Sequence, residues 1–522
     1  MPGSASELRG NSDGTRFRDG SLRWALLVAA ALSVAVLVTL DDYGVTYDEP
    51  DYLLAGSRYT DWLLNPSLST IDEQFDPTLS EHPPLANFAG GISVELLHDR
   101  MNLLDELLAH RISVVLFVFL INFALFRFSS ALFGPWIAGF VTVAYALLPR
   151  VFFHSHLGTL EYPMAALWFF VLYAYWRGMT ERRWVYVAAV ALGLALLTKI
   201  NGFFLYVPVV VLLALYFDRG EPRRSLAKLL PMLVIPPLVL VVGWPWLWPN
   251  PAARLLGYFA VFPDTTIPTY YLGVQYGAAP WHLPFVLAFL TLPLVVWVPA
   301  VVGSIVRWTD SRAKLFTAFN ALYPMVLITL SPSKHDGIRL FLPAFPFVCM
   351  LAGGGLCWAV RKLEPRGWSS LFRVGALVLL AVSLFFSVVA YHPYQSSYFG
   401  EVVGGVDGAR RFGFEVHYWC SAYKDLVPWL NENSVHTYHV PTCTHLLDFY
   451  RKQGTLSESV GFLPPWEADR VVLVGRFGVF RDEAWNYYRN KEPIFSVKVG
   501  GTSILGVYDL EHPVSSFCEP NY

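Results

Sequence analysis

The chain of 522 residues carries little charge. Asp, Glu, Lys and Arg make up 15% of it, whereas hydrophobic residues make up 55%. Soluble domains typically carry about 25% charged residues. This composition is typical of a polytopic membrane protein. The net charge of −2 excludes little, because the charges are segregated along the chain rather than mixed.

Cysteine is also scarce, with five residues and no Cys-x-x-Cys pair or other metal-type spacing. This argues against cysteine-based redox or zinc chemistry. Cys349 and Cys357 lie in an apolar run, and we expect them to be packing residues. Cys420, Cys443 and Cys518 lie in the C-terminal region and allow at most one disulfide among them.

Several functional signatures are missing. The sequence contains no Gly-x-Gly-x-x-Gly after a strand, no P-loop and no Gly-x-Ser-x-Gly elbow. It has no internal repeat, and its basic residues gather in loops that membrane topology explains, so nucleic acid is unsupported as a partner. The first apolar run, residues 24–40, lacks a small-residue cleavage site after it. We therefore expect an uncleaved first span rather than a signal peptide.

Long apolar stretches dominate what is present. A membrane-spanning helix needs roughly 17–25 residues, so the shorter stretches must take in flanking residues. We count eleven, within about two. They predict a mainly α, polytopic membrane protein with about eleven transmembrane helices, at residues 24–40, 111–126, 132–149, 162–176, 184–198, 201–217, 228–247, 284–306, 314–330, 340–360 and 371–391.

The placement of Lys and Arg predicts the orientation. Alternate loops are basic, whereas the loop 41–110 holds two Lys or Arg against fourteen Asp or Glu. Because cytoplasmic loops carry the excess of Lys and Arg, we expect residues 1–23 to form a cytoplasmic tail of a multi-pass protein of the plasma or inner membrane. The same alternation puts residues 392–522 outside.

Three further regions complete the predicted organisation. The transmembrane domain, residues 24–391, has two long outer loops, 41–110 and 248–283. They are aromatic and acidic, so we expect ordered segments at the membrane surface, with helical pieces at 50–64 and 92–108. Residues 392–522 show strands at 435–440 and 469–477, a helix at 444–454 and a hairpin at 492–510 that turns at Gly500-Gly501. These predict a small extracytoplasmic α/β domain.

Asp48 and Glu49 follow the first span closely. On a helix, adjacent side chains point about 100° apart, so the two carboxylates cannot act as a matched pair. One could be a base while the other binds a metal or orients a partner. A solvated acidic loop is the alternative.

Ionisable residues recur at the outer ends of the predicted spans. They are costly there and indicate a functional site by default. A cavity that opens outward, lined by acids and cations, would bring together Asp48, Glu49, His82, His154, His156, Glu161, Lys199, Lys334, His335, Asp336 and Arg339.

Each of these residues also has a structural interpretation. His82 precedes two prolines that fix a turn. Glu161 begins a span, where an acid complements a helix N-terminus. Lys199 could snorkel to the lipid headgroups. Lys334 and Arg339 could contact anionic headgroups without taking part in catalysis. His154 and His156 are two residues apart, which suits an extended turn better than a helical metal pair. No cofactor is indicated, and a divalent cation is left open.

Several motifs together resemble the GT-C superfamily of membrane glycosyltransferases. They are the Asp48-Glu49 pair, "HPPL" (82–85), Glu161-Tyr162-Pro163, the Lys between spans, "WPWLWPNPAARL" (244–255), "HDGIRLFLPAFPF" (335–347) and "HPYQSSYFGEVVGG" (392–405). The nearest branch is similar to the dolichyl-phosphate-mannose–protein mannosyltransferases, with lipid A aminoarabinose transferases as cousins.

The resemblance implies an enzyme that takes a hexose or pentose from a polyprenyl-phosphate carrier in the membrane and gives it to a hydroxyl of a protein, lipid or glycan. It implies that Asp48 is the general base, with Glu49 in support. It also implies that His82, Lys199 and Arg339 contact the donor phosphate and that His335 shares in this. Glu161 stands where the family usually has Asp.

This chemistry needs a base beside the nucleophile and fixed cations beside a departing phosphate. The outer acids and cations fit it, in an inverting displacement. A transporter or flippase of lipid-linked glycans is the alternative, but it should show paired broken helices and charges near mid-span. A non-catalytic scaffold would leave the acids and cations unexplained.

Overall fold

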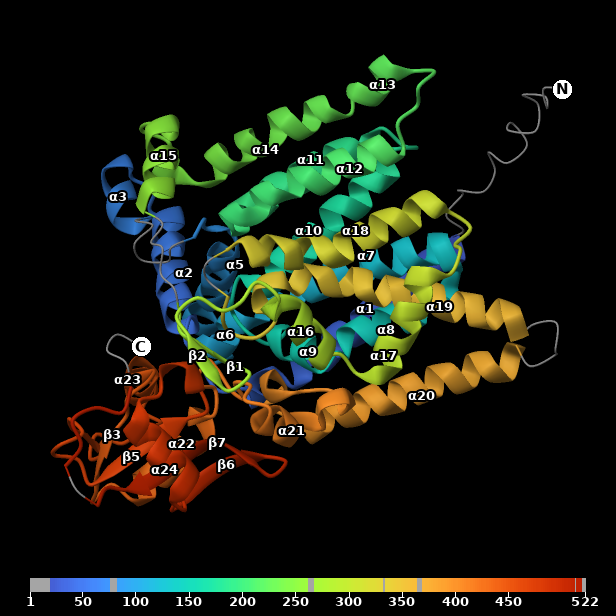
Figure 1. Ribbon diagram of the computed structural model, residues 1–522. Coiled ribbons are helices and arrows are strands. Elements are labelled where there is room, and N and C mark those ends of the chain that lie inside the picture. Colours follow the sequence, from blue (N-terminus) through green and yellow to red (C-terminus); the bar gives the residue numbers. More distant parts are fainter. Residues whose placement is uncertain are drawn as a thin grey trace.

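The computed structural model describes residues 19–75, 82–261, 267–331, 334–363, 369–511 and 513–518. It consists of a helical bundle and a smaller domain with a β-sheet at one end of it (Figure 1). The first helix, α1, begins at the opposite end of the bundle from that domain (Figure 1).

All eleven predicted apolar stretches form helices. They are α1 (Asp19–Val38), α6 with α7 (Glu106–Ile112 and Val114–Phe133), α8 (Pro135–Ala146), α10 (Glu161–Gly178), α11 (Arg183–Thr198), α12 (Tyr206–Leu215), α14 (Leu229–Gly243), α16 with α17 (Leu283–Leu290 and Leu294–Ile305), α18 (Ser311–Leu330), α19 (Phe345–Leu363) and α20 (Ser369–Ala390). Within the described ranges, six helical segments are long and apolar enough to cross a membrane, and α16 with α17, bent by 120°, would make a seventh.

The helix α10 lies at the centre of the bundle. Most of its side chains are buried, and it packs against α7 and α11. Its first residue, Glu161, is therefore held deep at the end of the bundle that carries the small domain. The fold class predicted from the sequence, a polytopic helical membrane protein with a small C-terminal α/β domain, is confirmed.

Ordered helices fill the first long loop. As predicted, residues 50–64 are helical, within α2 (Glu49–Leu64), which begins after Asp48 and has Pro50 in its first turn. The predicted helix 92–108 is interrupted: α5 (Leu85–Val94) runs into a π-helical turn (Glu95–Arg100), and α6 begins only at Glu106.

The second long loop is also ordered where it is described. It contains α15 (Pro251–Val261) and a hairpin of β1 (Thr269–Tyr271) and β2 (Val274–Tyr276). The side chain of Gln275 donates hydrogen bonds to backbone carbonyls of the C-terminal domain at Phe477 and Phe480. The hairpin thus joins the loop to that domain.

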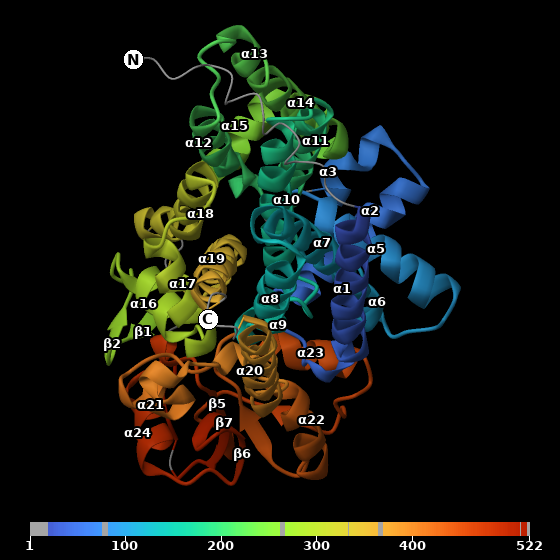
Figure 2. The same cartoon turned by 90° about the vertical axis from the view of Figure 1, so that its right-hand side faces the viewer.

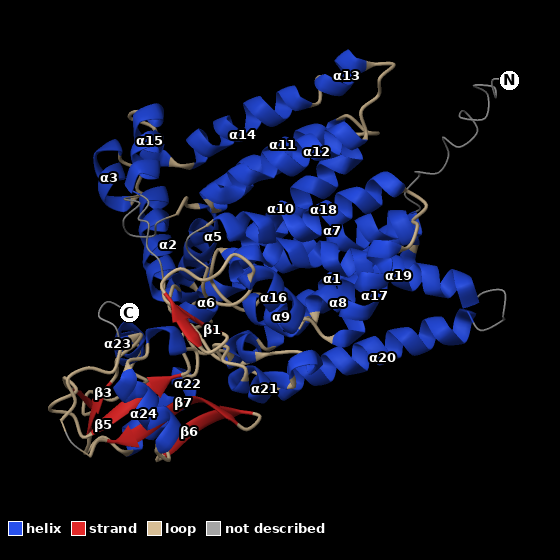
Figure 3. Ribbon diagram, in the orientation of Figure 1, coloured by secondary structure: helices blue, strands red, loops and turns tan. Residues whose placement is uncertain are grey.

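The C-terminal domain is a five-stranded mixed sheet with helices around it (Figure 3). The strand order is β4-β3-β5-β7-β6, in which β3 is parallel to β4 and β5, and β7 is antiparallel to β5 and β6. The strands are β3 (Thr437–His439), β4 (Gly461–Phe462), β5 (Arg470–Val474), β6 (Phe495–Val499) and β7 (Thr502–Asp509), and the helices are α22 (Tyr423–Glu432), α23 (Thr444–Lys452) and α24 (Asp482–Asn490).

The sequence predicted β3, β5, α23 and the β6–β7 hairpin. Gly500 turns that hairpin at φ +57°, a conformation that glycine adopts without strain. Among the described residues one disulfide forms, Cys420–Cys443, and Cys518 is buried. The helix α20 leads from the bundle into this domain, which lies across one end of the bundle (Figure 2).

Candidate functional site

Arg339 joins three carboxylates that come from three separate segments. It opens the 3-10 turn before α19, and its Nη1 donates a hydrogen bond of 2.8 Å to Oδ2 of Asp48. The same Nη1 lies 3.6 Å from Oε1 of Glu161, and Nη2 lies 3.2 Å from Oδ2 of Asp336. The side chain of Arg339 is 11% exposed and that of Asp48 20%. This charged array is therefore largely shielded from water.

Lys199 extends the array through Glu161. Lys199 lies in the chain between α11 and the 3-10 segment Ile200–Leu205, and its Nζ donates to Oε1 of Glu161 at 3.2 Å. Oε2 of Glu161 is buried and accepts no hydrogen bond from any residue that the structure describes. His82 and His154 interact electrostatically with Glu161. The structure thus brings Asp48, Glu161, Lys199 and Arg339 together.

The C-terminal domain reaches the array as well. Nη2 of Arg476, which follows β5, lies 3.3 Å from Oδ1 of Asp336. The indole Nε1 of Trp419 donates to Oδ2 of Asp336 at 3.1 Å, and the guanidinium of Arg339 lies over the Trp419 ring, 4.8 Å from its centroid. Nothing in the sequence indicated these contacts of Arg476 and Trp419.

The remaining candidate residues lie at different distances from this centre. Nε2 of His335 is 2.9 Å from Nη2 of Arg339, so His335 belongs to the array. The ammonium of Lys334 donates to the carbonyl of Ser331. His154 lies 3.4 Å from the hydroxyl of Tyr418. His156 instead contacts Thr39 Oγ1 at 2.8 Å and the carbonyl of Phe152 at 2.6 Å, which holds α1 against α9 (Pro149–His154).

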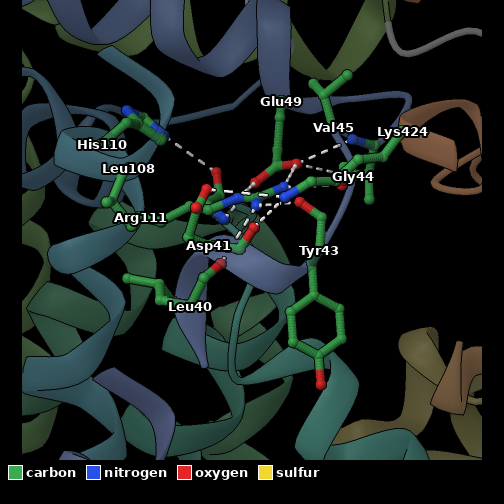
Figure 4. A network of polar contacts seen from close by, with 12 residues as sticks. Leu40, Asp41, Tyr43, Gly44, Val45, Glu49, Leu108, His110, Arg111 and Lys424 are labelled. Atoms are coloured by element: carbon green, nitrogen blue, oxygen red, sulfur yellow. Dashed lines mark hydrogen bonds and ion pairs between the residues drawn. The ribbon is translucent and has the colours of Figure 1, made fainter. Parts of the chain in front are cut away.

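Glu49 forms a buried ion pair with Arg111 (Figure 4). Arg111 donates to both oxygens of Glu49, at 2.7 and 2.6 Å. The amide of Gly158 donates to Oε1 at 2.8 Å, and the amide and hydroxyl of Thr46 donate to Oε2 at 2.9 Å each. Glu49 is fully buried, so it holds the segment that carries Asp48 rather than facing the array.

The surroundings shift the pKa values of Asp48 and Asp336 in opposite directions. Burial raises the pKa of Asp48, Arg339 opposes this, and the nearby charges of Glu161 and Asp336 raise it further, so the pKa lies above the ordinary value. Burial would also raise the pKa of Asp336, but Arg476 and Arg339 outweigh it and lower that pKa. Burial lowers the pKa of His335 to about 4. The carboxylate of Asp48 is therefore more basic than that of Asp336.

No group of three or more His, Cys, Asp or Glu side chains lies close enough to hold a metal ion in the described part of the chain. Instead, the three carboxylates of the array each pair with a cation. Their arrangement can accept a proton at Asp48 and bind an anion with Arg339, Lys199 and Arg476.

Comparisons with known proteins bear on the family and on the fold. A family model for dolichyl-phosphate-mannose-protein mannosyltransferase matches residues 81–248, which include His82, Glu161 and Lys199. No curated protein matches the sequence significantly.

Solved structures match over nearly the whole chain. ArnT from Cupriavidus metallidurans bound to undecaprenyl phosphate has a TM-score of 0.51 at 16% identity, covering 95% of this chain and 99% of that one. Its apo form gives a TM-score of 0.51 at 16% identity, with coverage of 96% and 100%. The apo Archaeoglobus fulgidus oligosaccharyltransferase has a TM-score of 0.49 at 14% identity, covering 91% and 71%. The chain has the GT-C fold, as its motifs predicted.

Proposed function

We propose that the protein is a membrane glycosyltransferase that moves a sugar from a polyprenyl-phosphate donor to a hydroxyl acceptor. The GT-C fold, the mannosyltransferase family model and the undecaprenyl phosphate bound to ArnT support this proposal. The observation that carries it is the single guanidinium of Arg339, which joins Asp48 to Glu161 beside Lys199. A base and two cations thus lie within one shielded site.

In the proposed reaction Asp48 takes the proton of the acceptor hydroxyl. The acceptor oxygen forms a bond to the anomeric carbon as the bond from that carbon to the phosphate oxygen breaks. The electron pair of the broken bond leaves with the phosphate, which Arg339 and Lys199 stabilise. A single displacement of this kind inverts the anomeric configuration.

The charges of this reaction balance within the site. The donor is a phosphodiester with one negative charge, and the product is a phosphomonoester with two. Asp48 becomes neutral as it takes the proton, so the total charge is unchanged. The three carboxylates already face three cations, Arg339, Lys199 and Arg476. Because the charge stays constant, the shielded site does not need to import a counter-ion during the step.

Donor binding also exchanges the partners of Arg339. Nη1 of Arg339 donates a hydrogen bond to Asp48. A phosphate that binds this guanidinium competes with the carboxylate, which leaves Asp48 free to accept a proton. The base is thereby activated when the donor is in place.

The basic loops support an orientation with residues 1–23 in the cytoplasm and the site on the outer face. The acceptor is a hydroxyl of a protein, lipid or glycan at that face. The transferred sugar is a hexose or a pentose.

Transfer by the purified protein tests the proposal. The protein is incubated in lipid nanodiscs with radiolabelled polyprenyl-phosphate sugars and an acceptor extract of the membrane. Time-dependent transfer of label that Asp48→Asn abolishes supports the enzyme. Movement of the labelled lipid between leaflets at equal rates in both proteins, with no transfer, would instead establish a flippase.

A further inference from the structure

A second charged feature lies at the end of the bundle remote from the C-terminal domain. A cavity of about 1450 Å³ opens there between the end of α10, the start of α11, the end of α12, the start of α18 and the short helix α13 (Pro222–Leu226). Figure 1 shows α13 at that end, far from the small domain. We call this the basic cavity, because six cations line it against two acids: Arg182, Arg219, Arg223, Arg224, Lys228 and Arg312 against Asp218 and Glu221.

Most of this positive charge is unneutralised. Arg224 pairs with Glu221 at 2.8 Å, and Lys228 donates to the carbonyl of Met179 at 3.0 Å. Three further arginines form no ion pair with any residue that the structure describes: Arg182, Arg219 and Arg223. The basic cavity therefore has free guanidinium groups, which suit the oxygens of a phosphate.

The walls of the basic cavity are apolar on one side. Val185, Leu215 and Pro231 line it together with the cations. The adjoining helix α14 exposes a row of apolar side chains, with Leu230 64%, Leu233 58% and Val234 48% exposed. In a membrane such a row faces acyl chains. A ligand that satisfies both sides has an anionic head and an apolar tail.

We propose that the basic cavity binds the phosphate headgroup of an anionic phospholipid in the leaflet opposite the Asp48 site, with the acyl chains along α14. Basic pockets between membrane helices are suited to such headgroups. Topology accounts for basic residues in the loops of this end, but it does not require six of them to line one cavity. A free phosphate ion would make no contact with the apolar row of α14.

Native mass spectrometry of the full chain tests the proposal. The protein is titrated separately with phosphatidylglycerol and phosphatidylcholine, and the titration with phosphatidylglycerol is repeated in the presence of inorganic phosphate. The test variant is Arg219→Gln/Arg223→Gln. The control, Arg307→Gln/Arg361→Gln, removes the same charge after α17 and in the last turn of α19, outside the basic cavity.

We expect phosphatidylglycerol to bind the test variant at least about tenfold more weakly, and the control variant as tightly as the unaltered protein. If phosphatidylglycerol bound both variants equally weakly, the loss would be due to surface charge in general, and the proposal would be overturned. So would equal binding of phosphatidylcholine, or displacement of the lipid by millimolar phosphate, which would indicate a site for soluble anions. All four positions are exposed, and thermal unfolding checks that both variants fold.

Discussion

Asp48 and Arg339 lie 291 residues apart in the sequence and share a hydrogen bond of 2.8 Å. In the proposed reaction one of them takes a proton and the other binds a phosphate. The proposed reaction therefore assigns its two functions to the two members of one ion pair. Any ligand that changes one member must change the other.

The first prediction concerns Asp48 itself. Asp48→Asn keeps the shape of the side chain but removes the base, so we expect the rate of sugar transfer to fall by about 10²–10⁴-fold. The matched control is Asp51→Asn, which changes an exposed carboxylate in the first turn of α2. Transfer should be unchanged in the control. Full activity of Asp48→Asn would remove Asp48 as the base.

The second prediction is a pH dependence. Asp48 must be ionised to take a proton, so kcat/KM should be lost as the pH falls through the pKa of Asp48. Burial raises that pKa above its ordinary value of 3.8, and the charge of Glu161 raises it further against Arg339. Glu161→Gln removes the contribution of the Glu161 charge. The acid limb of the pH profile of kcat/KM should therefore move to lower pH. An acid limb that stays at the same pH in Glu161→Gln, or moves to higher pH, contradicts the assignment of Asp48 as the base.

The third prediction separates binding from proton transfer. Arg339→Lys keeps the positive charge but loses the planar donors that reach Asp48 and Asp336. A hydrogen bond to a charged group contributes about 1.5–3 kcal/mol, so we expect KM for the donor to rise by roughly ten- to a hundredfold. Donor titrations at saturating acceptor measure this. An unchanged KM would place the donor phosphate elsewhere.

Part of this site could be predicted from the sequence. Asp48, Lys199 and Arg339 interrupt or border apolar stretches, and the cost of charge at a membrane boundary identifies them. That Asp48 and Glu49 diverge, by about 100° on a helix, follows from helix geometry alone. The eleven apolar stretches that form helices follow from their length and composition, and the β6–β7 hairpin follows from its turn residues.

Other contacts depend on tertiary structure. Arg476 follows a strand of a separate domain, and nothing local to it indicates that it reaches Asp336, 140 positions earlier. Arg111 lies at the start of an apolar stretch and gives no sign that Glu49 is its partner. The strand β4 has two residues, too few for a period to be read. Such pairings are decided by packing between distant segments.

The fourth prediction concerns stability. Glu49→Gln leaves Arg111 buried without its counter-charge, which costs about 3–5 kcal/mol. The thermal unfolding temperature should fall markedly, and transfer activity should fall with it. The control is Glu95→Gln, which breaks the exposed pair with Arg100, whose side chain is 56% exposed. An exposed pair contributes about 0–1 kcal/mol, so that variant should unfold close to the unaltered protein.

The last prediction assigns the C-terminal domain a part in the site. Arg476 contacts Asp336, which in turn contacts Arg339, so Arg476 acts as a positioning residue. In Arg476→Gln, Asp336 has Arg339 as its main cation and draws it from Asp48. We expect kcat/KM to fall by roughly three- to thirtyfold, with partial rescue in Arg476→Lys. Arg489→Gln, in the last turn of α24, is the control and should be fully active. A merely structural role would lower the unfolding temperature of Arg476→Gln and Arg476→Lys alike, whereas positioning predicts that activity follows the retained charge.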